Sequence, residues 1–300
     1  CGVFAAAAVA SRMLGLGGAQ TAHAFGTAGS MAGGLMAAQE GAMVKRVHAG
    51  RAAQAGVYAA LLARRGFTGI ENVLEIPFGG FYHAMSERYV PDFVTAGLGE
   101  KWETLLVGFK PYATAGAIHA SLAALDGIMG ENELGANNIE RIDVRCTTYC
   151  CKHVAWRYEP RGVAAAQLNM FYALSAMAID RAAMIEQFDE QRLADPRLLA
   201  FMPRIHVEPD PAFDALGHAF RYALRMMVAC RDGRSFERQS LHRPGTPDNP
   251  LSASRIEAKF RLLAGRVLPG GAVDEIVTTV SRLERLDDVK QLSALLVPAR

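Results

Sequence analysis

The hydrophobic pattern of this chain changes twice along its length, and these changes restrict the folds that it can adopt. Residues 1–103 are dense in Ala and Gly at helical spacing, residues 104–249 mix strand-like runs with helical stretches, and residues 250–300 return to helical spacing. Small residues let helix backbones approach closely, which favours tight helix packing. The sequence therefore predicts a large all-helical domain formed by both chain ends, with a smaller α+β domain inserted between them.

The middle segment contains the elements expected of an α+β domain. Thr114 is placed to cap a helix that runs to about Gly127, and the Asp232-Gly233 pair is typical of a two-residue hairpin turn. The predicted strands cover residues 104–109, 139–149, 204–208, 223–230 and 235–241, and a long helix covers residues 164–185. Beyond this segment, the spacing of Ser254 and Glu257 predicts a capped helix start.

Composition argues against several classes of protein. With 300 residues, of which 51% are hydrophobic and 21% charged, the chain is large enough for two globular domains. The net formal charge is only +2, and no window gathers Lys and Arg with aromatic residues, so nucleic acid is not an expected partner. The five cysteines form no regular framework, which favours reduced thiols and a cytoplasmic location. The spacing of Cys146, Cys150 and Cys151 matches no zinc motif, so we interpret these residues as structural.

The first residues carry no sign of a membrane element. The apolar run that begins at Cys1 is interrupted by Arg12, well short of the ~20 residues that a bilayer span requires. There is no initiator Met and no basic region of the kind that opens a signal peptide. We therefore expect neither a signal nor a membrane anchor, and we interpret the Ala-rich opening as that of a chain without its own beginning.

Three polar residues precede a helix of small side chains that ends at Gly66. Lys45, Arg46 and His48 lie at this helix start, where free backbone N–H groups would add donors for a carboxylate or phosphate. The helix dipole disfavours the imidazolium form of His48, which leaves its ring available as an acceptor or base. The alternative is a solvated loop with a packing histidine, and the residues alone leave both interpretations open.

A second group of this kind stands at the predicted domain boundary. Lys110 follows the predicted strand, Pro111 prevents further strand pairing, and His119 is expected about one and a half turns into the next helix. A lone lysine after a strand is usually an edge residue. Two such groups flanking a domain boundary nevertheless favour a binding cleft between the domains.

Familiar cofactor and catalytic motifs are missing from the sequence. It has no Gly-rich dinucleotide fingerprint, no phosphate loop, no His-Glu-x-x-His helix and no Gly-x-Ser-x-Gly elbow. An enzyme with this sequence would work by acid–base and electrostatic means, and we expect neither an organic cofactor nor a metal.

Six motifs in chain order resemble a known family. They occupy residues 1–8 (Cys-Gly-Val-Phe-Ala-Ala-Ala-Ala), 26–30, 43–54, 66–69, 109–112 with His119, and 249–252 followed by Lys259-Phe260. Together they resemble the MmgE/PrpD family, which contains 2-methylcitrate dehydratase, cis-aconitate decarboxylase and iminodisuccinate epimerase. The resemblance spans the whole chain, and the block Lys-Arg-Val-His-Ala-Gly-Arg-Ala-Ala-Gln is its most specific part.

The resemblance carries implications for the fold and the site. It implies a large helical domain made from both chain ends, a smaller α+β lid-like domain, and a homodimer. It also implies that roughly the first third of a full-length member, with an active-site aspartate and histidines, is absent. Lys45 and Lys110 correspond to two active-site lysines, and His48 and His119 to positions that are commonly histidine. Cis-aconitate decarboxylases carry another histidine five residues after the second lysine, where this chain has Ala115, and this departure weakens the decarboxylase interpretation.

Family substrates are small di- or tricarboxylates, and the shared chemistry is a carbanion next to a carboxylate. We assign carboxylate binding and charge stabilisation to Lys45, Arg46 and Lys110. Proton transfer is assigned to His48, to His119 or to a histidine of the absent segment, and substrate contact from the lid to Tyr158. The leading hypothesis is a cofactor-independent hydratase/dehydratase of an acid such as 2-methylcitrate. The enzymatic alternative is an epimerase or decarboxylase of iminodisuccinate or cis-aconitate, and the alternative of another class is a catalytically silent scaffold or fragment.

Overall fold

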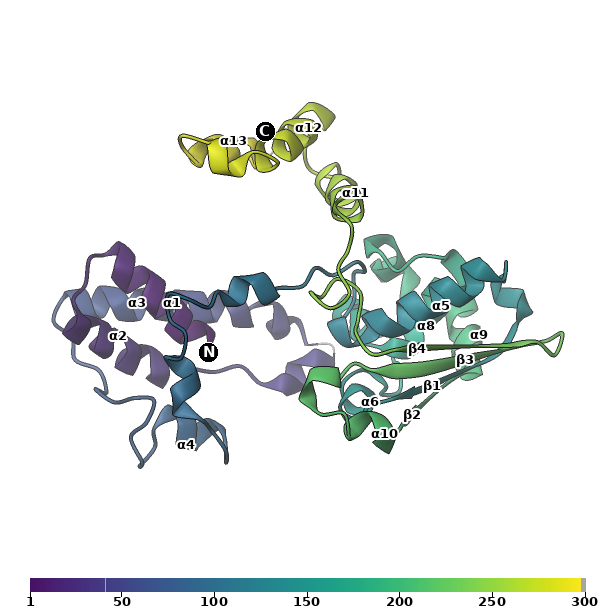
Figure 1. Cartoon of the computed structure of the whole chain (residues 1–300), viewed down its shortest axis with the longest axis horizontal. Coiled ribbons are helices and arrows are strands. Elements are labelled where there is room, and N and C mark those ends of the chain that lie inside the picture. The colour runs from purple at the N-terminus through teal and green to yellow at the C-terminus, as the bar shows by residue number, and fades with distance from the viewer. Residues whose placement is uncertain (41, 298–300) are drawn as a thin grey trace. The chain divides into compact units, whose positions relative to one another are not determined.

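The computed structural model describes residues 1–40 and 42–297. The chain divides into two compact units, Cys1–Trp102 and Glu103–Arg300 (Figure 1). The first unit is helical, and the second combines helices with a sheet.

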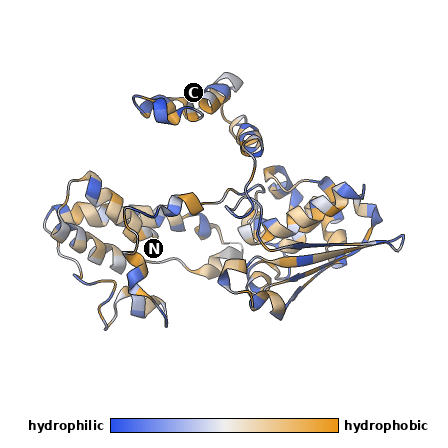
Figure 2. Ribbon diagram, viewed as in Figure 1, coloured by the Kyte–Doolittle hydropathy of each residue, from blue (hydrophilic) through white to orange (hydrophobic). Residues whose placement is uncertain are grey.

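Three helices form the core of the first unit. Its α-helices are α1 (Gly2–Met13), α2 (Gly18–Ser30), α3 (His48–Arg64) and α4 (Phe81–Met85), and the 3-10 helix η2 (Met43–Arg46) precedes α3. Helix α3 packs against both α1 and α2. One of the buried clusters that they share consists of one valine and four alanines, Val3, Ala7, Ala28, Ala55 and Ala59. These small apolar residues colour the three helices mainly tan and orange in Figure 2. Alanine thus fills the core, in agreement with the small-residue pattern of the sequence.

The crossing of α1 and α3 depends on Gly56. A Cβ atom on this residue would lie 2.5 Å from the Cβ of Ala6 and 2.6 Å from both the Ala7 nitrogen and the Val3 oxygen. Two of these three atoms belong to the backbone of α1, so a larger residue would have to push the helices apart. Gly50, in the first turn of the same helix, has nothing within 4 Å of its Cβ position.

This contrast predicts opposite effects for the same substitution within one helix. Gly56→Ala should lower the free energy of unfolding by about 1–3 kcal/mol, because the added methyl overpacks the α1–α3 contact. Gly50→Ala should raise it by at most about 1 kcal/mol, because alanine loses less backbone entropy in a helix. Urea unfolding followed by circular dichroism measures both values. Equal effects of the two substitutions would show that Gly56 does not govern the crossing.

The second unit is built around a four-stranded sheet. Its strands are β1 (Ile139–Cys146), β2 (Ile205–Pro209), β3 (Leu224–Cys230) and β4 (Ser235–Ser240), in the order β2-β1-β3-β4. Its α-helices are α5 (His119–Glu131), α6 (Thr148–Val154), α7 (Val163–Gln167), α8 (Met170–Asp180), α9 (Pro196–Phe201), α10 (Pro211–Asp214), α11 (Ala253–Ala264), α12 (Gly270–Val280) and α13 (Lys290–Leu295). Strands β1 and β2 pair in parallel, whereas β3 pairs antiparallel with both β1 and β4.

The sheet has one buried and one exposed face. Along β3, Leu224, Met226 and Val228 are fully buried, while the alternating Arg225 and Met227 are exposed. This period of two places every second side chain of β3 in the buried core. Helices α5 and α8 lie over one face of the sheet in Figure 1. The Asp232-Gly233 turn joins β3 to β4, with Gly233 at φ +86°, as the sequence predicted.

Some predicted elements were wrong. Residues 104–109 form no strand: the 3-10 helix η4 (Glu103–Leu106) occupies the first half of this run, and Leu105, Leu106 and Val107 are largely exposed. An apolar run has no intrinsic strand preference unless a sheet edge is there to pair with it. Residues 164–185 form two helices instead of one, because the Asn169 side chain accepts a hydrogen bond from Tyr172 N at 3.0 Å and caps α8.

The start of α5 also differs from the prediction. The hydroxyl of Thr114 donates to Ala115 O at 3.2 Å and caps no helix. A short 3-10 turn, η5 (Gly116–Ile118), follows, so that α5 begins at His119 itself and ends at Glu131. His119 is therefore the first residue of its helix. Strand β1 ends at Cys146, three residues before the predicted end, because Thr147 caps α6 through Cys150 N.

The C-terminal helices have a small apolar cluster of their own. Leu268, Val273 and Ile276 are buried there, with Phe260 and Leu292 packed against them. Helix α11 is capped by Ser252, whose hydroxyl accepts from Arg255 N at 3.3 Å; the predicted start at Ser254 lies two residues too late. These helices belong to the unit Glu103–Arg300. Their assignment to one domain with residues 1–103 stays a prediction.

Candidate functional site

The segment between η4 and α5 is fixed by backbone contacts. Phe109 N donates to Gly245 O at 2.7 Å, Ala113 N to Ala183 O at 2.9 Å and Ala115 N to Gln167 O at 2.8 Å. Gly245 has φ +89°, and a Cβ there would lie 1.8 Å from Phe109 O, so only glycine allows this approach. The loop after β4 is thereby held against the loop that carries Lys110.

His119 lies at the centre of this region and is fully buried. Its Nε2 lies 3.4 Å from Thr114 O, and because a carbonyl oxygen only accepts, Nε2 carries the hydrogen in this contact. Its Nδ1 is buried without a hydrogen-bond partner among the described residues. Burial lowers the pKa of His119 to about 3, and the charges of Lys110, Arg243 and Lys259 lower it further, against the opposing effect of the Thr114 hydrogen bond. The ring is therefore neutral near pH 7.

Three cations surround this neutral ring. Lys110 Nζ donates to Thr114 O at 3.3 Å, the same oxygen that His119 contacts. Lys259 Nζ, from α11, donates to the backbone oxygen of Lys110. Arg243 also reaches this segment, with Nη1 2.0 Å from the position that a Cβ on Gly116 would take. We call Lys110, Arg243 and Lys259 the cation cluster.

Neighbouring aromatic residues support the cation cluster. The guanidinium of Arg243 lies 5.3 Å from the ring centroid of Tyr222, a cation–π distance. The buried Tyr112 meets the His119 ring edge-on at 5.5 Å. Burial raises the pKa of Tyr112, and the charge of Asp126 acts in the same direction, whereas Arg255 lowers it. Tyr112 is therefore a neutral phenol, and the region combines several cations with neutral hydrogen-bonding groups.

Three further predicted site residues, Lys45, Arg46 and His48, lie in the first unit. Lys45 and Arg46 belong to η2 and are exposed, and His48 is the first residue of α3 and half-buried. The predicted position of Lys45 and Arg46 before a helix, and of His48 at its start, is confirmed. Their participation in one site with Lys110 stays a prediction.

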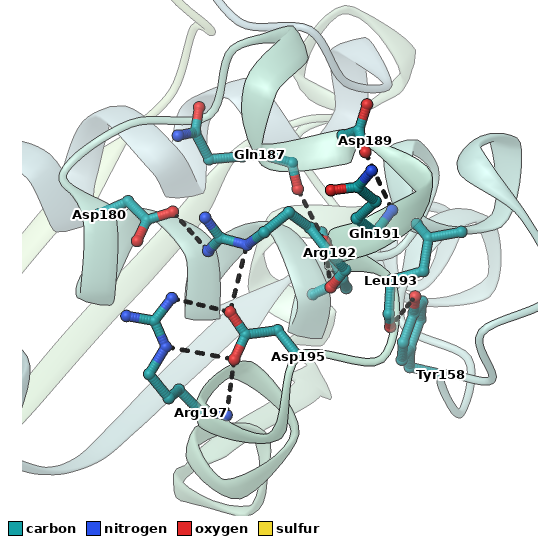
Figure 3. A network of polar contacts seen from close by, with 10 residues as sticks. Tyr158, Asp180, Gln187, Asp189, Gln191, Arg192, Leu193, Asp195 and Arg197 are labelled. Atoms are coloured by element: carbon teal, nitrogen blue, oxygen red, sulfur yellow. Dashed lines mark hydrogen bonds and ion pairs between the residues drawn. The ribbon is translucent and has the colours of Figure 1, made fainter.

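Tyr158 makes structural contacts in the second unit. Its hydroxyl donates to Leu193 O at 2.9 Å, and its ring lies 5.0 Å from that of Tyr172. Figure 3 shows it beside a network in which Arg192 bridges Asp180, at 2.7 Å, and Asp195, at 3.2 Å. Burial raises the pKa of Tyr158, and the nearby Tyr172 adds to this rise. Its role in substrate contact stays a prediction, and the structure gives its hydroxyl a backbone partner.

The cysteines lie mostly in the core. Cys146, Cys150 and Cys230 are buried, and the sulfurs of Cys146 and Cys151 are 3.4 Å apart. Within residues 1–40 and 42–297, no group of three or more His, Cys, Asp or Glu side chains is arranged to hold a metal ion. None of the helices in that part of the chain combines the length and apolarity that a bilayer crossing demands.

Two members of the cation cluster were not predicted as site residues. Lys259 belonged to one of the family motifs, but its position on a C-terminal helix gave no reason to place it beside Lys110. Arg243 begins a proline-rich segment that the sequence presents as the end of a domain. A signal existed in Gly245, two residues later, because a glycine between prolines suggests a close backbone approach.

Two family models together cover most of the chain. Residues 1–93 match the MmgE/PrpD N-terminal domain, and residues 112–285 match the MmgE/PrpD C-terminal domain. The chain belongs to the MmgE/PrpD family. The resemblance derived from the six motifs is thus confirmed. The boundary between the two family domains falls in the segment that carries Lys110.

Several curated relatives in the MmgE/PrpD family are similar to this chain. Cis-aconitate decarboxylase of Aspergillus terreus is 32% identical over 310 residues, which cover 98% of this chain and 63% of that protein. The cis-aconitate decarboxylase-like protein oryM of Aspergillus oryzae is 32% identical, with coverages of 97% and 63%. The human cis-aconitate decarboxylase is 29% identical, with coverages of 98% and 61%. The chain therefore spans less than two thirds of the length of these relatives.

Proposed function

We propose that this protein is a cofactor-independent lyase that decarboxylates a small unsaturated tricarboxylate such as cis-aconitate. The observation that carries the proposal is the cation cluster around a neutral, buried His119 in a member of the MmgE/PrpD family. The relatives above are named as acting on cis-aconitate, and this favours decarboxylation over our leading sequence-based hypothesis, the dehydration of 2-methylcitrate. One feature of the chain argues against decarboxylation: Ala115 stands where we expected a histidine in a decarboxylase.

The proposed reaction needs charge stabilisation more than it needs a strong base. The bond between carbon and the departing carboxylate breaks, carbon dioxide leaves, and the electron pair stays on the substrate. This pair is delocalised into the neighbouring double bond and carboxylate, and a proton then adds to carbon. Fixed cations lower the energy of such a charge-bearing transition state because they are oriented before the reaction begins. Lys110 is our candidate for this role, with Lys45 and Arg46 as predicted partners.

The neutral state of His119 limits what it can do. With a pKa of about 3, its ring is not an imidazolium near pH 7 and is a poor proton donor. We therefore propose that His119 positions the Lys110 loop through Thr114, and that proton delivery falls to another group. His48 stays our candidate for that group.

Product analysis tests the reaction. The purified protein is incubated with cis-aconitate, 2-methylcitrate, citrate and iminodisuccinate in deuterium oxide and followed by NMR. We expect carbon dioxide release from cis-aconitate together with one deuterium incorporated from solvent. Dehydration of 2-methylcitrate would restore the hydro-lyase hypothesis, and deuterium exchange without net conversion would indicate an epimerase. Absence of turnover with all four acids would favour the scaffold alternative.

The domain arrangement is a further part of the proposal. We propose that α11–α13 complete the helical domain of residues 1–103 and that the protein forms a homodimer. Several large apolar side chains of both segments are exposed, among them Met13 at 82% and Val57 at 46% in the first unit and Val267 at 64% and Val289 at 61% in the second. Cross-linking with mass spectrometry tests the first point, and sedimentation tests the second.

A further inference from the structure

The cation cluster brings together residues from three separate parts of the second unit. Lys110 lies in the loop before α5, Arg243 in the loop after β4, and Lys259 in α11. In the described part of the chain, neither Arg243 nor Lys259 forms an ion pair with a carboxylate, whereas arginines elsewhere in this unit do, such as Arg238 with Glu131 and Arg266 with Glu186. Two like charges that are held close to each other without carboxylate partners, as those of Arg243 and Lys259 are, repel one another unless an anion joins them.

The fold holds both Arg243 and Lys259 in place. The backbone contact between Phe109 and Gly245 brings the Arg243 loop to the Lys110 loop. Tyr222 supports the Arg243 guanidinium, and the missing side chain of Gly116 makes room for it. Lys259 is anchored by its hydrogen bond to Lys110 O and is half-buried. Burial lowers the pKa of Lys259, which is the expected cost of keeping a cation away from water.

We propose that Arg243 and Lys259 bind substrate carboxylates and, with Lys110, select a tricarboxylate over a dicarboxylate. This inference rests on the proposed function for the choice of substrate, and it adds two residues and a basis for specificity. One cation faces each of three carboxylates, and Arg243 contributes the planar, two-pronged geometry that carboxylates favour. A dicarboxylate would leave one of the three cations without a substrate carboxylate, and this difference is the source of the selectivity.

Binding of a substrate-like acid that does not react tests the inference independently of turnover. Isothermal titration calorimetry compares tricarballylate, which has three carboxylates, with glutarate, which has two. The unmodified protein should bind tricarballylate at least about 10-fold more tightly. Arg243→Met and Lys259→Met should each weaken tricarballylate binding by about 10- to 100-fold and bring it close to that of glutarate.

Gly116→Ala offers a variant that keeps every charge. Its methyl group would occupy the position of Arg243 Nη1 and displace the flexible end of that side chain, so the fold should persist while the tricarboxylate preference falls. The matched control is Gly127→Ala in α5, where a Cβ would lie 1.8 Å from Nη1 of Arg238, an arginine outside the cation cluster. This control should keep the preference.

The possible outcomes separate the inference from the proposed reaction. Unchanged binding in Arg243→Met and Lys259→Met would overturn the inference, as would equal binding of the two acids by the unmodified protein. Loss of the preference in these variants and in Gly116→Ala, but not in Gly127→Ala, supports it. If that pattern appears while cis-aconitate is not converted, the reaction is wrong and the tricarboxylate site stands.

Discussion

Replacing Lys110 by methionine is expected to lower the turnover of cis-aconitate by about 100- to 1,000-fold, the range found when one oriented group that stabilises a developing charge is removed. Lys110 lies on the loop that Gly245 and Thr114 hold in place, so its ammonium is already oriented before substrate binds. Methionine keeps much of the length of the side chain and removes the charge together with its N–H donors. The folded structure should persist, because Lys110 is an exposed residue whose hydrogen bond to Thr114 O contributes little to stability.

The measurement is the initial rate of carbon dioxide release, with circular dichroism to check folding. Lys290→Met serves as control, since this lysine is 88% exposed in its side chain and lies at the start of α13. It should leave the rate unchanged. Lys45→Met should reduce the rate to a similar degree if both lysines act on one substrate, and the double variant should then lose less than the product of the two effects. Full activity of Lys110→Met would refute the site assignment.

The second large effect concerns stability at acidic pH, and it arises from His119. The pKa of this buried ring is lowered to about 3 in the folded protein, against 6.5 for an unperturbed histidine. Above pH 6.5 the ring is neutral in both states, so His119 adds no pH dependence there. Below pH 6.5 the unfolded chain binds a proton that the folded protein does not bind until about pH 3, and the folded state loses stability as the pH falls.

The expected slope is about 1.4 kcal/mol for each pH unit in this window, and the total amounts to several kcal/mol. His119→Gln should remove this contribution while keeping an N–H donor for Thr114 O. Urea unfolding at several pH values between about 7 and 4.5 gives the slopes for both proteins. The difference in unfolding free energy between them should shift with pH in favour of His119→Gln as the solution becomes more acidic. Parallel slopes would mean that His119 is protonated in the folded protein.

Local sequence patterns were sufficient to predict many of the helices and strands. The Asp232-Gly233 pair defined the β3–β4 hairpin, and the small-residue helix from His48 to Arg64 was predicted at its observed start. Both rest on backbone preferences that act between neighbouring residues. The interpretation failed where partners distant in sequence decided the outcome. Residues 104–109 have the composition of a strand, but their backbone contact is a loop glycine and not a sheet edge.

The sequence by itself determined the family, the helical character of the first unit and the position of Lys45 and His48 at a helix start, because these depend on residue order and local geometry. Only the tertiary structure decided that Arg243 and Lys259 join Lys110, since Lys259 and Lys110 are 149 positions apart and meet through a backbone oxygen. It also decided that His119 is neutral, because burial depends on the packing of the whole unit around it. Spacing within a motif describes which residues are neighbours along the chain, whereas charge state and substrate selectivity follow from which residues become neighbours in space.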